Sequence, residues 1–385
     1  MIMSKIKSSA PVTPPVKGSG RNLGIEMLRI VSTMMVIMLH TLGSTAILSS
    51  YMYTGKGTVL WMLEILSYCA VNCFAITSGY VSCKSKFKIS RLLYLWFQVM
   101  FIFVVMTIAW GQIAPDKLDE HAYRDMFFPI LADLNWYFTA FFGMSLFSPF
   151  MNLLMEKMTK NQHKYLVILI FILFCIPTRI PEVSDLFKIG GGYSMLWLCA
   201  MYIIGGYIRI HGVPNRKNRG LWLMGYFASS LFVWMYFIIV ADITRSTLGE
   251  AKYHRIFLSY TSPFIVLAGI CLVEFFLTLE IKKCSKFIST LGSLTFGIFI
   301  FHTQDLYWIL VLEGCVNAIA KENTLIVTLG VFGIVIGTFI VCGAATYLQT
   351  LLFKLIGINK FCDFVQNKWF AKASAMLESP KEKSE

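Results

Sequence analysis

Arg29 and His40 fall inside a strongly apolar stretch of the chain. An ionisable side chain in such a place is costly, so it usually serves function or pairs with a partner. The two residues are 11 positions apart, and 11 steps of 100° end only ~20° past three full turns of an α-helix. Glu26 belongs to the same helical stripe, one turn before Arg29. At about 1.5 Å per residue, His40 lies about 16 Å deeper than Arg29, near the middle of a membrane.

His302 matches His40 in depth, because it lies well inside a second apolar stretch, at 288–312. Asp305 follows three residues later and can face the same way on a continuous helix. The imidazole pKa of about 6.5 suits proton transfer near neutral pH. For either histidine alone, a polar contact between helices is the simpler interpretation. Two histidines at one depth favour a shared polar cavity in which a proton is moved.

Two further groups flank these histidines along the chain. Ser78, Gly79 and Tyr80 end an apolar stretch and offer hydroxyl groups and close backbone approach. The cations that follow them are Lys84, Lys86, Lys88 and Arg91. They would suit a phosphate-bearing coenzyme, although membrane topology also requires such residues. At the start of a later stretch, Asn135 and Trp136 would suit a sugar or equally a membrane interface.

The composition restricts the elements that can position these residues. Of the 385 residues, 57% are apolar or aromatic and 14% are charged, where a soluble domain carries about 25% charged residues. This excludes a soluble enzyme, a disordered protein and a secreted disulfide scaffold. The sequence therefore predicts an all-α, polytopic membrane protein.

Ten apolar stretches are close to the ~20 residues that a transmembrane helix needs. They lie at 25–47, 59–82, 92–111, 129–154, 164–181, 193–210, 221–241, 256–279, 288–312 and 324–353. With both termini in the cytoplasm, 25 of the 34 Lys and Arg residues fall on the cytoplasmic side, as the positive-inside rule expects. The net charge of +13 is then a topology signal, and we expect no nucleic-acid partner.

The organisation expected is a disordered cytoplasmic tail at 1–20, a transmembrane domain at 21–356 and a cytoplasmic tail at 357–385. The first span is expected to be a retained signal anchor, since no cleavage site follows it. The ten cysteines are scattered singly, so we expect neither a disulfide nor a metal site.

Six short motifs, in order along the chain, are similar to those of the bacterial membrane acyltransferase-3 family. They are Arg21-Asn22 with Glu26, Leu28, Arg29 and His40; Asn72-Cys73-Phe74 with Ser78-Gly79-Tyr80; Arg91; Trp136-Tyr137-Phe138 with Pro149 and Asn152; Ile204-Gly205-Gly206-Tyr207; and Leu294 to His302. Phe296 departs from the pattern, because a Tyr is common there. The chain also lacks the extracytoplasmic domain that some members append, so we expect the stand-alone form.

The resemblance implies that acyl-CoA, usually acetyl-CoA, is the donor at the cytoplasmic face. The acceptor implied is a hydroxyl of an envelope or exported polysaccharide, or of its lipid-linked precursor, at the outer face. His40 would act as general base or carry the acyl group, supported by Arg29 and Glu26. The expected donor-binding residues are Ser78, Gly79, Tyr80, Lys84, Lys86, Lys88 and Arg91. Those expected near the acceptor are Asn72, Asn135, Trp136, His302 and Asp305.

Two other classes of protein compete with this interpretation. A secondary transporter of an envelope saccharide explains the spans and buried ionisable groups equally well, but it would favour inverted repeats, which the sequence does not show. A membrane sensing module would carry an appended soluble domain. Besides the donor and the acceptor, the only partners expected are membrane lipids, and the oligomeric state stays open.

Overall fold

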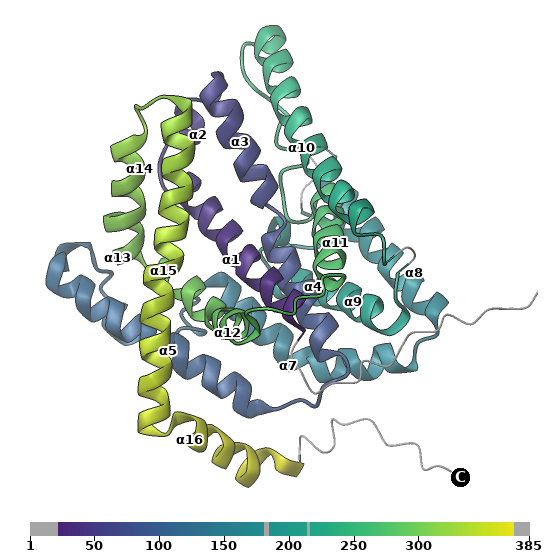
Figure 1. Ribbon diagram of the computed structural model, residues 1–385, viewed down its shortest axis with the longest axis vertical. Coiled ribbons are helices and arrows are strands. Elements are labelled where there is room, and N and C mark those ends of the chain that lie inside the picture. Colours follow the sequence, from purple (N-terminus) through teal and green to yellow (C-terminus); the bar gives the residue numbers. More distant parts are fainter. Residues whose placement is uncertain (1–21, 181–184, 214–215, 373–385) are drawn as a thin grey trace, which may run out of the picture.

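All regular structure in the described part of the chain is helical, which confirms the predicted fold class. The structure is a computed structural model that describes residues 22–180, 185–213 and 216–372; the predicted tail at 1–20 lies outside these ranges. The α-helices are α1 (Leu23–Gly43), α2 (Ile47–Ser50), α3 (Gly55–Ser67), α4 (Ala70–Ser82), α5 (Ile89–Ile113), α6 (Ala122–Asp125), α7 (Trp136–Lys157), α8 (Lys160–Ile170), α9 (Met195–His211), α10 (Arg219–Leu248), α11 (Pro263–Leu277), α12 (Ser285–His302), α13 (Asp305–Tyr307), α14 (Gly314–Ile319), α15 (Thr324–Ile356) and α16 (Ile358–Val365). Figure 1 shows their arrangement.

Each of the ten predicted spans contains helix in its described part, although α7 begins only at Trp136 and α11 only at Pro263. Among the described residues, seven helical segments are long and apolar enough to cross a membrane: Leu23–Gly43, Gly55–Ser82, Ile89–Ile113, Trp136–Lys157, Lys160–Arg179, Arg219–Leu248 and Thr324–Ile356. A bent pair of helices, Ser285–His302 and Asp305–Ile319, makes an eighth if it counts as one span. Met195–His211 and Pro263–Leu277 are apolar but shorter. The protein is therefore a multi-pass membrane protein.

The prediction of one continuous helix at 288–312 is wrong. α12 ends at His302, and the helical segment Asp305–Ile319 leaves it at an angle of 78°. The hydroxyl of Thr303 and the amide of Gln304 both donate to the Ile300 carbonyl oxygen, each at 3.0 Å. These side chains satisfy a carbonyl that a continuing helix would have used. The chain can thus turn within an apolar region without leaving this backbone group unpaired.

Helix α1 lies in the middle of the bundle, where it contacts α3, α4, α11, α12 and α15 (Figure 1). Asn22 caps its first turn by accepting hydrogen bonds from the backbone N–H groups of Gly24 and Ile25. Glu26 and Thr33, which belong to the stripe that carries Arg29 and His40, are both buried. The polar stripe of α1 therefore faces other helices and not lipid, as a functional stripe in a membrane helix should.

Gly79 is a packing residue between α4 and α9. A Cβ atom on Gly79 would collide with the carbonyl oxygen of Tyr202, and one on Gly205 would collide with that of Ile76. The two glycines thus let the two backbones touch. The side of α4 that carries Gly79 is occupied by protein, so the structure gives Gly79 a packing role, and its donor binding stays a prediction.

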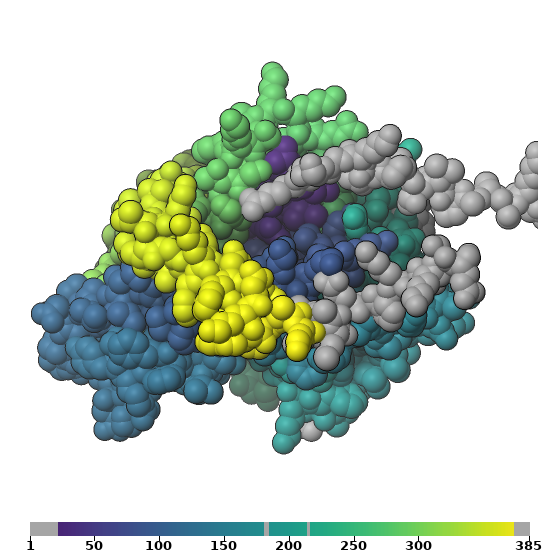
Figure 2. All heavy atoms as spheres, turned by 90° about the horizontal axis from the view of Figure 1, so that it is seen from below, coloured from purple at the N-terminus to yellow at the C-terminus, as the bar shows by residue number. Residues whose placement is uncertain are grey.

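The predicted tail at 357–385 begins as a helix. Gly357 ends α15 in the left-handed conformation, with φ +80°, and α16 then packs against α5 (Figure 2). The side-chain oxygen of Gln366 accepts a hydrogen bond from the Ser90 backbone N–H at 3.2 Å. Residues 358–372 are therefore folded onto the bundle, and the rest of the predicted tail lies outside the described residues.

Candidate active site

His40 on α1 and His302 at the end of α12 are hydrogen-bonded to each other. The Nδ1 atom of His40 lies 2.8 Å from the Nε2 atom of His302. His302 is fully buried and His40 is partly buried. The matched depth of the two residues in the sequence predicted this meeting.

The hydrogen bonds of the pair determine which nitrogen carries each proton. The Nδ1 atom of His302 lies 2.9 Å from the Ile298 carbonyl oxygen, which can only accept, so this nitrogen bears a proton. In the neutral ring the Nε2 atom of His302 then accepts, and the Nδ1 atom of His40 must donate to it. The Nε2 atom of His40 is left with a free lone pair. A chain of carbonyl, imidazole and imidazole thus holds His40 in the tautomer that a general base or nucleophile needs.

Aromatic rings enclose the histidine pair. The centroid of the Trp308 ring lies 5.1 Å from that of His40, and the Phe299 ring lies 5.8 Å from His302. Tyr137 packs edge-on against Phe299 at 5.0 Å. Sequence reasoning did not select Trp308, because it follows the helix break that the apolar pattern did not reveal.

A cavity of about 570 Å³ extends from this enclosure, within the ~300–1,000 Å³ that small-molecule sites usually have. We call it the first cavity. Its lining includes Arg29, Phe74, Ser78, Ser90, Arg91, Tyr94, Tyr137, Phe141, Gly292, Ser293, Thr295, Phe296, Phe299, Asn359, Cys362 and Asp363. These residues come from the helices α1, α4, α5, α7, α12 and α16.

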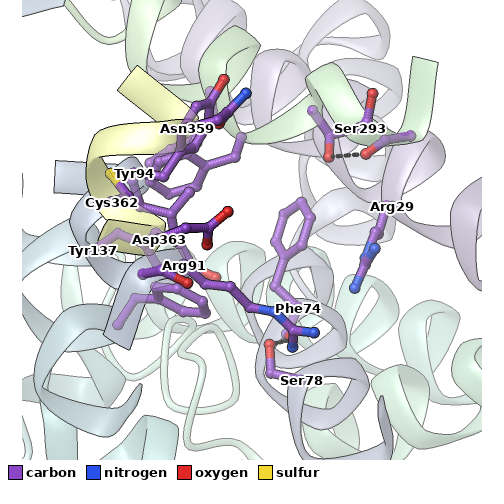
Figure 3. Close-up of a pocket in the computed structure, with 17 residues that line it drawn as sticks. Arg29, Phe74, Ser78, Arg91, Tyr94, Tyr137, Ser293, Asn359, Cys362 and Asp363 are labelled. Carbon is purple, nitrogen blue, oxygen red and sulfur yellow. Dashed lines mark hydrogen bonds between the residues drawn. The ribbon is translucent and has the colours of Figure 1, made fainter. Parts of the chain in front are cut away.

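Two guanidinium groups point into the first cavity. Figure 3 shows Arg29 from α1 and Arg91 from α5 reaching toward the space beside Phe74 and Ser78. Arg29 is one-third exposed, although its guanidinium is also paired with the buried Glu26 carboxylate. The planar guanidinium group of an arginine can donate two hydrogen bonds to two oxygens of one phosphate. The end of the first cavity that carries Arg29 and Arg91, which we call its mouth, is therefore suited to a ligand with several phosphate charges.

Glu26 supports Arg29 and does not reach His40. Its Oε1 atom lies 3.3 Å from the Nη1 atom of Arg29, and its carboxylate packs against Gly292. Glu26 and His40 are 14 positions apart on one helix, or about 21 Å at 1.5 Å per residue. The structure therefore makes Glu26 a positioning residue for Arg29.

Only some of the predicted donor-binding residues line the first cavity. Arg91 and Ser78 do, although the Ser78 hydroxyl already donates to the Phe74 carbonyl oxygen at 2.8 Å. Tyr80 faces away, and its hydroxyl accepts a hydrogen bond from Arg209 at 3.3 Å. The exposed loop between α4 and α5 carries Lys84, Lys86 and Lys88, and none of these three is in the described lining.

A second arginine pair holds Tyr80 in this position. The guanidinium carbon of Arg209 lies 5.1 Å from the centre of the Tyr80 ring, and that of Arg216 lies 6.0 Å away. Arg216 donates two hydrogen bonds to the fully buried Glu274, at 2.9 and 3.0 Å. These bonds raise the pKa of Arg216. Tyr80 thus belongs to a structural contact between α4, α9 and α11.

Helix α16 contributes a thiol and a carboxylate to the first cavity. Cys362 is 2% exposed, and this burial raises the pKa of its thiol, so the thiol is protonated and unreactive at neutral pH. Asp363 is exposed and faces the space near Arg91 (Figure 3). The sequence pattern predicts a cytoplasmic tail here, and neither residue was predicted to belong to the site.

The residues expected near the acceptor separate into distinct places. Asn72 is fully buried and accepts a hydrogen bond from the Trp197 indole at 3.0 Å, which is a packing role. Asn135 caps α7 and lies 3.2 Å from the Thr303 hydroxyl, one residue from His302. The Trp136 ring packs on Tyr193, with centroids 4.5 Å apart.

Asp305 does not share a face with His302. The break after α12 turns it away, and it lines a separate cavity of about 220 Å³, which we call the second cavity. The expectation that Asp305 faces the same way is therefore wrong, because it assumed a continuous helix.

A family model described as an acyltransferase domain matches residues 22–346 of the chain. No curated protein and no solved structure matches. The matched range includes both histidines, Arg29 and Arg91, but it ends before α16.

Proposed function

Because the chain belongs to the membrane acyltransferase-3 family, whose members transfer acyl groups to hydroxyls of saccharide-type acceptors, we propose the following reaction. The protein transfers an acetyl group from cytoplasmic acetyl-CoA to a hydroxyl of a cell-surface or exported polysaccharide, or of its lipid-linked precursor. The membrane would be the bacterial cytoplasmic membrane. The observation that supports this most is the free Nε2 atom of His40, held by His302 beside a cavity with two arginines.

In the proposed reaction the first cavity takes the coenzyme. Arg29 and Arg91 would bind phosphate groups, and the thioester would reach the aromatic enclosure around Tyr137 and Phe299. The positive-inside distribution of Lys and Arg supports a cytoplasmic position for this mouth of the cavity. The tightly packed rings would exclude water, which would otherwise hydrolyse the thioester.

His40 would then act as the general base. Its Nε2 atom takes the proton of the sugar hydroxyl while the oxygen attacks the thioester carbonyl carbon. The carbon–sulfur bond breaks, and the CoA thiolate takes the proton back from the His40 imidazolium. In the alternative route, the Nε2 atom of His40 itself attacks the carbonyl, releases CoA, and passes the acyl group to the hydroxyl in a second step.

The function is tested on the polysaccharide itself. NMR of the surface polysaccharide from strains with and without this protein is expected to show an O-acetyl signal that depends on the protein. Purified protein with labelled acetyl-CoA should then label a saccharide acceptor. A polysaccharide that is unchanged on deletion, together with no release of CoA in vitro, would contradict the proposal.

Labelling of the protein with donor alone separates the two routes. Direct transfer leaves the protein unlabelled after a single turnover without acceptor. The two-step route leaves label on His40, and the label should leave again when acceptor is added.

Replacing Arg91 with alanine is expected to raise the KM for acetyl-CoA by about 10–100-fold. A hydrogen bond to a charged group contributes about 1.5–3 kcal/mol, and about 1.4 kcal/mol corresponds to a factor of ten. Lys88→Ala is the matched control, because Lys88 is a nearby exposed cation outside the described lining of the first cavity. Equal effects of the two substitutions on KM would show that only the general positive charge matters.

Replacing Asp363 with asparagine is expected to lower the KM for acetyl-CoA about two- to fivefold. The substitution removes a carboxylate from a cavity that must take phosphate groups, and the effect stays small because Asp363 is exposed to solvent. Salt screens such repulsion, so the gain should shrink as the ionic strength of the assay rises. A higher KM would mean that Asp363 contacts the donor favourably.

A further inference from the structure

The second cavity opens at the helix break that follows His302. It is formed by the end of α5, the connection from Pro115 to Leu134, and the residues of the break. Its lining includes Phe103, Trp110, Lys117, Asp119, Asp125 and Asp305. Among the described residues, none lines both cavities.

Residues of neighbouring helical turns line the two cavities close to His302. On α12, Phe299 lines the first cavity and Thr303 lines the second, four residues apart on one helix face. His302, the last residue of α12, lies between them in the chain and is in neither described lining. At 1.5 Å per residue, only about 6 Å of helix separates Phe299 from Thr303.

The start of α7 repeats this arrangement. Leu134 lines the second cavity, and Tyr137, three residues later, lines the first. Asn135 joins the two elements through its hydrogen bond to Thr303. α5 follows the same order along its length, with Arg91 on the first cavity and Trp110 on the second. Along α12 and α7 the partition between the two linings is thus about one helical turn long, and His302 lies in that turn, whereas along α5 eight residues separate Leu95 from Phe103.

The second cavity offers many hydrogen-bond acceptors. The Asp305 carboxylate makes no hydrogen bond or ion pair with the rest of the described chain. Gln304 uses its Nε2 group on the Ile300 carbonyl oxygen, which leaves its Oε1 atom as an acceptor. One oxygen of Asp119 accepts a hydrogen bond from the His121 backbone N–H at 2.8 Å, and one oxygen of Asp125 accepts from the Arg124 side chain at 2.7 Å. Hydroxyl groups of a ligand would find partners here.

The size and charge of the second cavity limit the class of ligand that it can bind. Its volume of about 220 Å³ is below the ~300–1,000 Å³ of sites that take drug-sized ligands, so it suits a single sugar ring. Trp110 and Phe103 add aromatic surface beside the polar groups, the mixture that ligand sites usually have. In the described lining, three carboxylates against the single ammonium group of Lys117 disfavour an anionic ligand.

We propose that the second cavity is the acceptor subsite and that it takes one uncharged pyranose ring of the saccharide. This inference rests on the proposed acyl transfer and adds a location and a charge preference to it. Asp305, Gln304 and the loop carboxylates accept hydrogen bonds from ring hydroxyls. The hydroxyl to be acylated points through the thin partition toward the Nε2 atom of His40.

The charge preference is tested with small acceptors. Purified full-length protein is assayed with labelled acetyl-CoA and methyl glycosides of glucose, galactose and mannose, each paired with the corresponding uronide. Neutral glycosides are expected to have a KM at least tenfold below that of the paired uronides. Uronides that are used equally well or better would overturn the proposal, as would an enzyme that accepts only longer chains and is not inhibited by any neutral glycoside.

Variants of Asp305 test the location. Asp305→Ala is expected to raise the acceptor KM about tenfold, and Asp305→Lys to reverse the preference between neutral glycoside and uronide. The matched controls are Asp116→Ala and Asp116→Lys, because Asp116 is an exposed carboxylate in the connection from Pro115 to Leu134 and does not itself line the cavity. Acceptor KM values that stay at the wild-type level in both Asp305 variants would overturn the proposal.

Failure of this inference differs from failure of the proposed function. If the wild-type protein acylates a saccharide but the Asp305 variants behave like the Asp116 controls, the function stands and the acceptor lies elsewhere. If the wild-type protein releases no CoA and modifies no saccharide, the function itself is wrong.

Discussion

Replacing His40 with alanine is expected to reduce acyl transfer by about 10²–10⁴-fold, the range that removing a general acid–base group usually costs. The geometry leaves one nitrogen of the pair, the Nε2 atom of His40, unprotonated and free of a partner in the described chain. Two other ionisable side chains of the site cannot replace His40 as the base. The Cys362 thiol is buried and protonated, and Glu26 lies about 21 Å from His40 along α1. The measurement is the initial rate of acetyl transfer by purified protein at saturating acetyl-CoA.

His254→Ala serves as the control for this substitution. His254 is a partly buried histidine in the connection between α10 and α11, where its ring packs on Phe237 at 4.9 Å. It lines neither described cavity, so its variant should keep the wild-type rate. The catalytic role of His40 would be contradicted if the His40→Ala enzyme transferred acetyl groups at half the wild-type rate or better, with unchanged protein content in the membrane.

The histidine pair was predictable because its signals are local and periodic. The 11-residue spacing from Arg29 fixes the face of His40 on a straight helix, and α1 is continuous from Leu23 to Gly43 and central. Depth along two helices that start from the same side then predicts that His40 and His302 can meet. The observed hydrogen bond of 2.8 Å agrees with this reasoning.

The position of Asp305 was not predictable from the same pattern. Neither Thr303 nor Gln304 is a residue that normally breaks a helix, and the apolar residues continue past them. The break depends on side-chain hydrogen bonds to the Ile300 carbonyl, which periodicity does not encode. The same break contributes to the second cavity, so the apolar pattern does not predict that cavity either.

The basic cluster after α4 shows a different limit of prediction from sequence. Positive residues at cytoplasmic ends serve topology, and their residue type does not reveal whether they also face a ligand. Of the four cations predicted to bind the donor, only Arg91 points into the first cavity as described. It begins α5, whereas Lys84, Lys86 and Lys88 precede that helix. Helix α16 was not predicted either, because it is short and lies outside the long apolar stretches from which the spans were predicted.

His302→Leu is expected to lower acyl transfer by about 10²-fold, the lower end of the range for a general acid–base group. Leucine fills a similar volume but cannot accept the hydrogen bond from the Nδ1 atom of His40, so His40 is free to rotate or to place its proton on Nε2. A base with its proton on the reacting nitrogen cannot take another, and the loss therefore appears in kcat. The KM for acetyl-CoA should change less than twofold, because His302 does not line the first cavity.

His302→Gln separates this positioning role from simple packing. The Oε1 atom of glutamine reaches about as far from the backbone as the Nε2 atom of histidine and can accept the same hydrogen bond. We expect this variant to retain kcat within about tenfold of the wild type, well above the leucine variant. If instead leucine and glutamine lower kcat equally, at equal protein content, then His302 only fills space and the tautomer of His40 is set by another group. If both retain wild-type kcat, the pair of histidines is a structural contact and the free nitrogen of His40 needs no support to do its chemistry.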